Sequence, residues 1–121
     1  MNKRKIGTEG EKQALEFLLE EGLAIIATNY YCKLGEIDII AKDNETTVFI
    51  EVKYRKDDKM GRPYESVNYF KQMKIIKSAM WFAQQKNIYD KPMRFDVIEI
   101  IANELHWIRN AFTMDGHFKL L

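Results

Sequence analysis

Two aliphatic segments of this chain, GEIDIIA and VFIEVKYR, carry ionisable side chains at Asp38, Glu51 and Lys53. An ionised group that leaves water costs several kcal/mol unless a partner compensates it, so charges among isoleucine and valine need a cause. A hard divalent cation such as Mg²⁺ is one such cause, because it binds carboxylate oxygens and keeps several of its waters. A lysine beside the ion can polarise a water and stabilise charge on a phosphoryl oxygen. These residue types therefore point to the hydrolysis of phosphodiesters.

The expected geometry depends on the turn between the two segments. If residues 44–45 form a two-residue hairpin loop, Asp38 lies directly opposite Glu51. The same register places Glu36 opposite Lys53. Directly opposite Cβ atoms are roughly 4.5–5.5 Å apart, which is close enough for two carboxylates to share one cation. Without a cation the two carboxylates repel each other, and one of them tends to take up a proton.

A salt bridge is the alternative to a metal. Lys53 can pair with Glu51 or Glu36, and a partly solvated sheet face carries such pairs safely. Because side chains alternate along a strand, Ile37 and Ile39 are expected to share the opposite, apolar face. The residue types alone leave both explanations open.

Hydrophobic periodicity predicts the elements that position these residues. Apolar residues at helical spacing predict a helix over about 7–21, and Gly22 favours its end. Three β-prone runs follow at 23–31, 36–42 and 46–54, with turn residues between them. The first half of the chain is thus expected to be a helix followed by a three-stranded meander.

A polar loop over 55–64 leads to a second, long helix that Ser66 is expected to cap and that ends near Lys86. Strands are predicted at 93–101 and 104–109. A helix between the third and fourth strands permits a parallel crossover, so the order predicts an α/β protein of the α+β type with one mixed sheet flanked by helices. We expect a single domain over residues 1–121. The apolar positions expected to face the core from the second helix are Val67, Phe70, Met73, Ile76, Ala79, Met80 and Ala83.

Composition narrows the class of protein more than its function. With 19 basic and 18 acidic residues the net charge is +1, so the chain is not uniformly basic. Basic residues do cluster over 53–62 and on one face of the second helix, where a solvated helix face is the simpler explanation. The single cysteine, Cys32, excludes an internal disulfide and a thiolate zinc cluster. Short apolar runs offer no membrane span or signal core, which predicts a cytoplasmic protein.

Five segments together resemble a known group of enzymes: GTEGEKQAL, GEIDII, VFIEVKYR, GRPYESV and RFDVIEI. They are similar to the PD-(D/E)XK nuclease superfamily and, more narrowly, to its YraN-like family, which is related to Holliday-junction resolvases. Asp38 matches the aspartate of the motif, and Glu51 and Lys53 match its E-x-K. Ile37 stands where the eponymous proline would be. The resemblance implies the restriction-endonuclease-like fold with its αβββαβ core.

The resemblance also implies an activity, metal-dependent hydrolysis of DNA or RNA. Asp38, Glu51 and Val52 would belong to a site for Mg²⁺ or Mn²⁺, and Lys53 would assist the nucleophilic water. Glu11 matches a further acidic position that related resolvases carry on the first helix. Its alternative role is that of an ordinary exposed helix glutamate.

Nucleic acid is the expected partner, and branched or junction DNA is favoured by the resemblance. One active site cuts one strand, so symmetric cleavage would require a homodimer. Two alternatives stay open: a non-catalytic nucleic-acid-binding module on the same fold, and a protein-interaction scaffold. The residues expected to contact phosphates are Arg55, Lys56, Arg62, Lys71 and Lys74.

Several other polar and aromatic residues have two possible roles. The tyrosines at 54, 64 and 69 can stack on unpaired bases or simply pack against the protein. Gln72 lies where superfamily members often place a helix residue near the site. Asp96 is expected to form an ion pair with Arg94 or another basic neighbour rather than to bind a metal.

Overall fold

The computed structural model describes residues 2–57, 59 and 67–114. Within these ranges, neither helix is long and apolar enough to cross a membrane. The described residues form two helices and five strands in the predicted order. Their bounds are α1 (Asn2–Glu20), β1 (Ala24–Cys32), β2 (Gly35–Asp43), β3 (Thr46–Arg55), α2 (Tyr69–Gln85), β4 (Met93–Ile101) and β5 (Glu104–Phe112).

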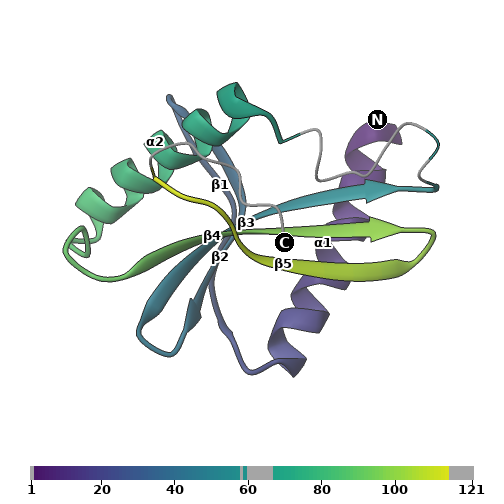
Figure 1. Cartoon of the computed structure of the whole chain (residues 1–121), viewed down its shortest axis with the longest axis horizontal. Coiled ribbons are helices and arrows are strands. Elements are labelled where there is room, and N and C mark those ends of the chain that lie inside the picture. Colours follow the sequence, from purple (N-terminus) through teal and green to yellow (C-terminus); the bar gives the residue numbers. More distant parts are fainter. Residues whose placement is uncertain (1, 58, 60–66, 115–121) are drawn as a thin grey trace.

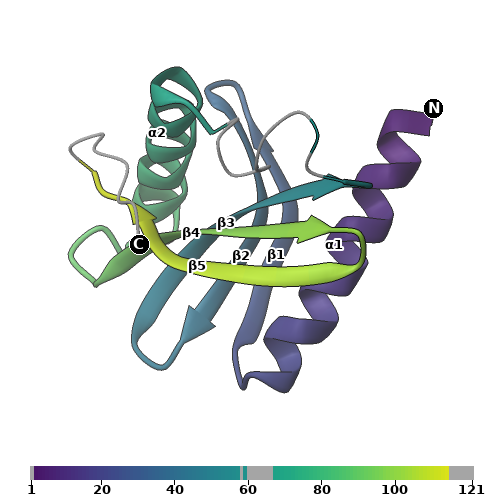
Figure 2. The same ribbon diagram turned by 45° about the vertical axis from the view of Figure 1, so that its right-hand side comes forward.

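The strands form one sheet in the order β1-β2-β3-β4-β5. β3 and β4 run parallel, whereas the other neighbours are antiparallel. The connection between the parallel strands contains α2, as a crossover requires. Figure 1 and Figure 2 show α1 and α2 on opposite sides of this sheet. The predicted mixed sheet flanked by helices is confirmed and is consistent with a nuclease-like α+β fold.

The sheet separates two hydrophobic cores. The α2-side core contains, among others, Ile37, Phe49, Ile76, Phe82 and Phe95. The α1-side core contains, among others, Ala14, Leu18, Ile39, Ile50 and Ile98. Both faces of the central strands are therefore covered, so a charged residue in these strands stays in contact with water only near the strand ends.

Turn residues end the elements where the sequence predicted. Gly22 follows α1 with a φ of +93°, a conformation that glycine adopts without strain. The β2–β3 hairpin turns through Asn44, which has a φ of +56°. Ala102 and Asn103 both have positive φ, +50° and +68°, as the two-residue hairpin between β4 and β5 requires.

The start of α2 differs from the prediction. Its N-cap is Asn68, whose Oδ1 accepts a hydrogen bond from the Lys71 backbone N–H at 3.0 Å, while Ser66 lies outside the described residues. Phe70 was expected in the core but is 76% exposed, because it lies opposite the buried stripe of the helix. The buried residues of α2 are Gln72, Ile75, Ile76, Ser78, Ala79, Phe82 and Ala83.

Candidate active site

The β2–β3 ladder opens at the acidic residues. Its pairs run from Asp43–Thr46 to Ile39–Ile50, which confirms the register of a two-residue loop. Asp38 and Glu51 come one step beyond the last pair, so the predicted direct pairing of these two residues is not part of the ladder. Instead, Asp38 Oδ2 accepts a hydrogen bond from the Val52 backbone N–H at 2.8 Å. A carboxylate of β2 thus takes a backbone donor of β3.

The strand on the other side of β2 is also irregular at this level. Asn29 in β1 has a φ of +51°, which interrupts the extended conformation of the strand at the level of Asp38. Ile37 packs in the α2-side core, whereas Ile39 packs in the α1-side core. The prediction that these two isoleucines share a face is therefore wrong, because the alternation slips at Asp38.

Glu51 is buried and is held by two lysines. Its Oε2 lies 3.3 Å from Lys53 Nζ and 3.1 Å from Lys71 Nζ. The Lys53 pair is the salt bridge that the sequence offered as the alternative to a metal. Lys71 was predicted to contact phosphates, but here it reaches from α2 to the sheet and has a half-exposed side chain. The two ammonium groups together compensate the carboxylate of Glu51.

The electrostatics of Asp38 are different. Burial raises the pKa of its carboxyl to about 8, and repulsion by Glu51 adds to the increase, while the Val52 hydrogen bond opposes it. Desolvation lowers the pKa of Lys53 despite the attraction of Glu51. Desolvation also acts against the charged form of Lys71, but attraction by Glu51 and hydrogen bonding leave its pKa raised. Asp38 is thus a partly buried acid with no full compensation for a negative charge.

The donors fit a hard divalent ion in type, but few of them are side chains. Carboxylate oxygens of Asp38 and Glu51 suit Mg²⁺ or Mn²⁺, and the β3 residue between Glu51 and Lys53, Val52, can add a backbone carbonyl. Among residues 2–57, 59 and 67–114, no three side chains of the types His, Cys, Asp and Glu converge on a metal position. Water would have to complete the coordination, as is usual for magnesium.

Glu11 comes close to this site from α1. Burial raises the pKa of its carboxyl, repulsion by Glu36 and Glu51 adds to the increase, and a side-chain hydrogen bond with Asn29 opposes it. Gly10 permits the approach, since a Cβ there would lie 3.0 Å from the Cβ of Tyr54. Asn29 was missed by the sequence reasoning. Its one local signal was an asparagine, a residue that tolerates positive φ, inside a β-prone run.

Comparison with known proteins places the chain in a family. Residues 10–100 match the family described as "Uncharacterised protein family UPF0102". The chain belongs to UPF0102. This family is the YraN family, so the resemblance drawn from the sequence is confirmed. The matched range contains all four predicted catalytic positions, 11, 38, 51 and 53.

UPF0102 proteins from several organisms are similar over nearly their whole length. A relative from Fusobacterium nucleatum is 47% identical over 110 residues, which are 91% of this chain and 92% of the relative. A relative from Thermodesulfovibrio yellowstonii is 47% identical over 113 residues, 93% of this chain and 99% of its own. A third, from Caldicellulosiruptor saccharolyticus, is 42% identical over 118 residues, 93% of this chain and all of its own. Their names carry the family and no activity.

The remaining basic residues predicted to bind phosphate are dispersed. Arg55 is half-buried at the end of β3, and Lys56 is exposed directly after it. Lys74 is exposed on α2. Arg62 lies outside the described residues. Lys71 is therefore the one predicted phosphate contact that the described structure brings directly to Glu51.

Gln72 has a structural role at the start of α2. Its side chain is buried, and Nε2 donates a hydrogen bond to the Val67 carbonyl oxygen at 2.9 Å. Among the described residues its Oε1 has no hydrogen-bond partner. This side chain fixes the entry of the chain into the helix that carries Lys71.

The tyrosines predicted either to stack on bases or to pack against the protein have different environments. Tyr54 is half-buried and packs against the α1-side core, which supports a packing role. Tyr69 is exposed, and its ring makes an edge contact with Phe70 at a centroid distance of 5.9 Å. Tyr64 lies outside the described residues.

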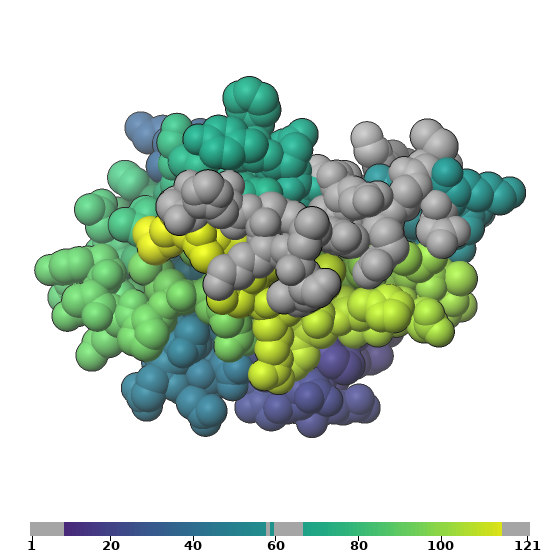
Figure 3. Space-filling view, viewed as in Figure 1, coloured from purple at the N-terminus to yellow at the C-terminus, as the bar shows by residue number. Residues whose placement is uncertain are grey.

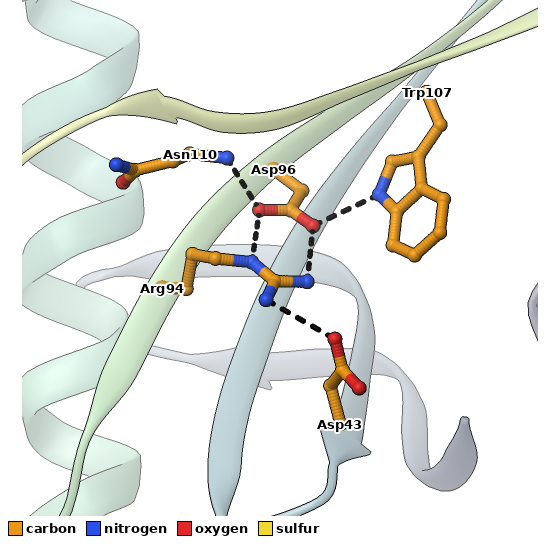
Figure 4. A network of polar contacts seen from close by, with 5 residues as sticks. All are labelled: Asp43, Arg94, Asp96, Trp107 and Asn110. Carbon is orange, nitrogen blue, oxygen red and sulfur yellow. Dashed lines mark hydrogen bonds and ion pairs between the residues drawn. The ribbon is translucent and has the colours of Figure 1, made fainter. Parts of the chain in front are cut away.

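Asp96 forms the predicted ion pair with Arg94, within a larger network (Figure 4). Its carboxylate is completely buried and accepts two hydrogen bonds from Arg94, through Nε and Nη2, each 2.9 Å long. Trp107 Nε1 and the Asn110 backbone N–H donate two more, also at 2.9 Å. Arg94 Nη1 reaches Asp43 at 3.1 Å. The four hydrogen bonds thus satisfy the hydrogen-bonding capacity of the Asp96 carboxylate.

Proposed function

We propose that this UPF0102 protein is a metal-dependent nuclease that hydrolyses phosphodiester bonds of DNA. The observation that carries the proposal is the position of Asp38 and Glu51 just beyond the last pair of the β2–β3 ladder, where burial and repulsion by Glu51 raise the pKa of Asp38 to about 8. A partly buried carboxyl that is costly to ionise is stabilised by a divalent cation. Perturbed acids of this kind gather at functional sites.

Each residue of the site has a distinct role in this proposal. Asp38 and Glu51 hold Mg²⁺ or Mn²⁺ with the backbone carbonyl of Val52, and the ion, when bound, supplies positive charge to the phosphate and to the attacking water. Lys53 orients the water and stabilises charge on a phosphoryl oxygen. Lys71 neutralises Glu51 before the ion binds, and its half-exposed ammonium group can then turn to a substrate phosphate. Glu11 is a third acidic group at the edge of this site.

One observation favours a second candidate, a nucleic-acid-binding module without catalysis. Lys53 and Lys71 already compensate Glu51 without any metal. A protein that kept only the binding surface would be stable in this state. The two candidates differ in their dependence on divalent ions, because phosphate binding by lysines requires no metal.

The deciding experiment is cleavage of labelled duplex, single-stranded, flapped and four-way-junction DNA, and of RNA, with Mg²⁺, Mn²⁺ or EDTA. Glu51→Gln removes the charge of the proposed ligand and nearly preserves its shape. Glu45→Gln makes the same chemical change in the exposed turn between β2 and β3, so it serves as the matched control. We expect metal-dependent cutting by the wild type and the control, and none by Glu51→Gln.

Two results would contradict this expectation. Equal cutting by Glu51→Gln would show that the activity comes from elsewhere, including a contaminant. Binding of substrates without any cutting by the wild type would favour the binding module. Symmetric nicking of a junction would further call for a homodimer, whose presence can be measured by sedimentation.

A further inference from the structure

The outer face of α2 carries an ordered set of exposed side chains. Phe70, Lys74, Lys77 and Trp81 are spaced by four, three and four residues, so they form one straight stripe along the helix. This stripe, called the outer stripe below, lies opposite the residues that α2 buries against the sheet. Phe70 is 76% exposed and Trp81 39% exposed. In Figure 3 the first turns of α2, in teal, stand at the upper edge of the molecule.

The charge of the outer stripe is positive and uncompensated within its helix. α2 contains three lysines and no acidic residue. Within the described part of the chain, no carboxylate forms an ion pair with Lys74 or Lys77. The two lysines lie between the two aromatic rings. The stripe therefore offers a ring for stacking at each end and basic groups for phosphates in the middle.

This composition distinguishes among possible partners. A duplex contacted through its backbone needs the lysines but has no use for exposed rings. A protein partner would be favoured by a continuous apolar patch, which the central lysines interrupt. An unpaired nucleic-acid strand needs both groups, since its bases stack on aromatic side chains and its phosphates bind basic ones. Charge and chemistry therefore select the single strand.

The position of the outer stripe connects it to the candidate site. Phe70 directly precedes Lys71, the residue whose Nζ lies 3.1 Å from Glu51. Helical rise places Trp81 about 16 Å further along the axis, well away from that carboxylate. A strand on the stripe would thus run along α2 with one end at the site.

We propose that the outer stripe of α2 binds an unpaired nucleic-acid strand that leads to Glu51. Resting on the nuclease function proposed above, this inference assigns a substrate with a single-stranded arm. The binding itself requires neither metal nor cleavage, so it can be tested separately.

The first test follows tryptophan fluorescence during titration with oligothymidylate, oligouridylate or a blunt DNA duplex, in EDTA and at low salt. Stacking on Trp81 should quench the emission of the wild type. In Trp81→Phe the remaining emission comes from Trp107, on the other face of the sheet, and should change little. Quenching by at least one of the two single strands supports the proposal, and equal quenching by the duplex would overturn it.

The second test measures affinity by anisotropy of the labelled strand. The double variant Phe70→Ala, Trp81→Ala should bind roughly 25-fold more weakly or worse, since each stacked base contributes at least about fivefold. Phe70→Tyr keeps a ring and should bind like the wild type. Tyr89→Ala removes another exposed aromatic side chain, 60% exposed and beyond the end of α2, and should have no effect. Replacing Lys74 and Lys77 with Gln should reduce the salt dependence of binding.

The outcomes separate this inference from the nuclease proposal. Strand binding that depends on the stripe supports the inference even if the protein never cuts. Unchanged affinity of the folded double variant, or no strand binding by the wild type, overturns it even if the protein does cut. Altered self-association of the double variant with unchanged strand affinity would also overturn it, because the stripe would then be a protein interface.

Discussion

Two acidic clusters lie in the same sheet, and they balance charge in different ways. Asp96 is completely buried and accepts four hydrogen bonds, two of them from one guanidinium. Asp38, which is only partly buried, accepts one hydrogen bond from the described residues, from the Val52 backbone. Burial raises its pKa, and repulsion by a second carboxylate, that of Glu51, raises it further. The more deeply buried acid is thus the better compensated one.

This difference separates a structural role from a functional one. A saturated network such as that of Asp96 fixes strand positions and has no free lone pair for a ligand. An acid whose ionisation is disfavoured gains free energy when a cation arrives, so it is suited to binding. In this sheet the compensated carboxylate of Asp96 therefore lies at the start of β4. The poorly compensated carboxyl of Asp38 lies where β2 and β3 separate.

Removing the partner of the saturated acid should have the largest effect on stability. Arg94→Met leaves Asp96 buried without its guanidinium, and we expect the free energy of unfolding to fall by about 3–5 kcal/mol. Denaturation in urea at pH 7 measures this change. A loss similar to that of an ordinary surface substitution would contradict the view that Asp96 is a compensated buried charge. Lys91→Met, an exposed change in the preceding turn, is the control.

A smaller loss is expected from one hydrogen bond of that network. Trp107→Phe removes the indole N–H but keeps an aromatic ring, which can retain the edge contact that Trp107 makes with Phe17. A hydrogen bond to a charged group contributes about 1.5–3 kcal/mol, so unfolding should become easier by that amount. Trp81→Phe on the outer face of α2 makes the same replacement where no described residue accepts a hydrogen bond from the indole, and it should cost little. Equal effects of the two variants would assign the loss to ring size alone.

The sequence predicted only part of the difference between the two acidic clusters. Local patterns predicted the strands, the turn at Asn44 and the pair Arg94–Asp96, because alternation and turn chemistry act over a few residues. They also selected Asp38, Glu51 and Lys53, which the structure brings together at adjoining strands. The slip at Asp38 was not predicted, since strict alternation was assumed along the strand; Asn29, at the same level of the neighbouring strand β1, also leaves the extended conformation.

Contacts between α2 and the sheet were equally hard to predict. The ion pair of Lys71 with Glu51 joins residues from different elements, and its formation depends on how far the helix lies along the sheet. Phe70 was placed in the core because its spacing suits one helical stripe, but packing selected another stripe that includes Ile75 and Phe82. Hydrophobic periodicity limits which faces of a helix can be buried, and tertiary packing decides which of them is buried.

Asp38→Asn should stabilise the metal-free protein, in contrast to the destabilising changes at Arg94 and Trp107. The pKa of Asp38 is raised from its ordinary value of 3.8 to about 8 in the folded protein, so the folded state binds more protons between about pH 4 and pH 8. Wild-type stability should therefore fall as the pH rises through this window, whereas the variant lacks this contribution and can still accept the Val52 hydrogen bond. At pH 8 we expect the metal-free variant to gain at least about 1.4 kcal/mol, the free energy of one pKa unit. Urea denaturation at several pH values measures it.

The same variant tests the link to metal. Mn²⁺ affinity, measured by calorimetry, should drop in Asp38→Asn, and the protons released on binding to the wild type near pH 7 should disappear. Asp57→Asn, an exposed aspartate after β3, should leave both quantities unchanged. If Asp38→Asn bound Mn²⁺ as the wild type does, the two clusters would no longer differ in function.

The smallest expected effect concerns the half-exposed lysine of the site. Lys71→Met removes an ammonium group that competes with a cation for Glu51, so Mn²⁺ affinity should increase. Ion pairs near the surface contribute up to about 1 kcal/mol, which corresponds to an increase of about two- to fivefold. Lys77→Met removes an equal charge from the outer face of α2 and should change affinity less. A decrease in Mn²⁺ affinity for Lys71→Met would show instead that this lysine holds Glu51 in position for the ion, so that the pair prepares the site rather than competing for it.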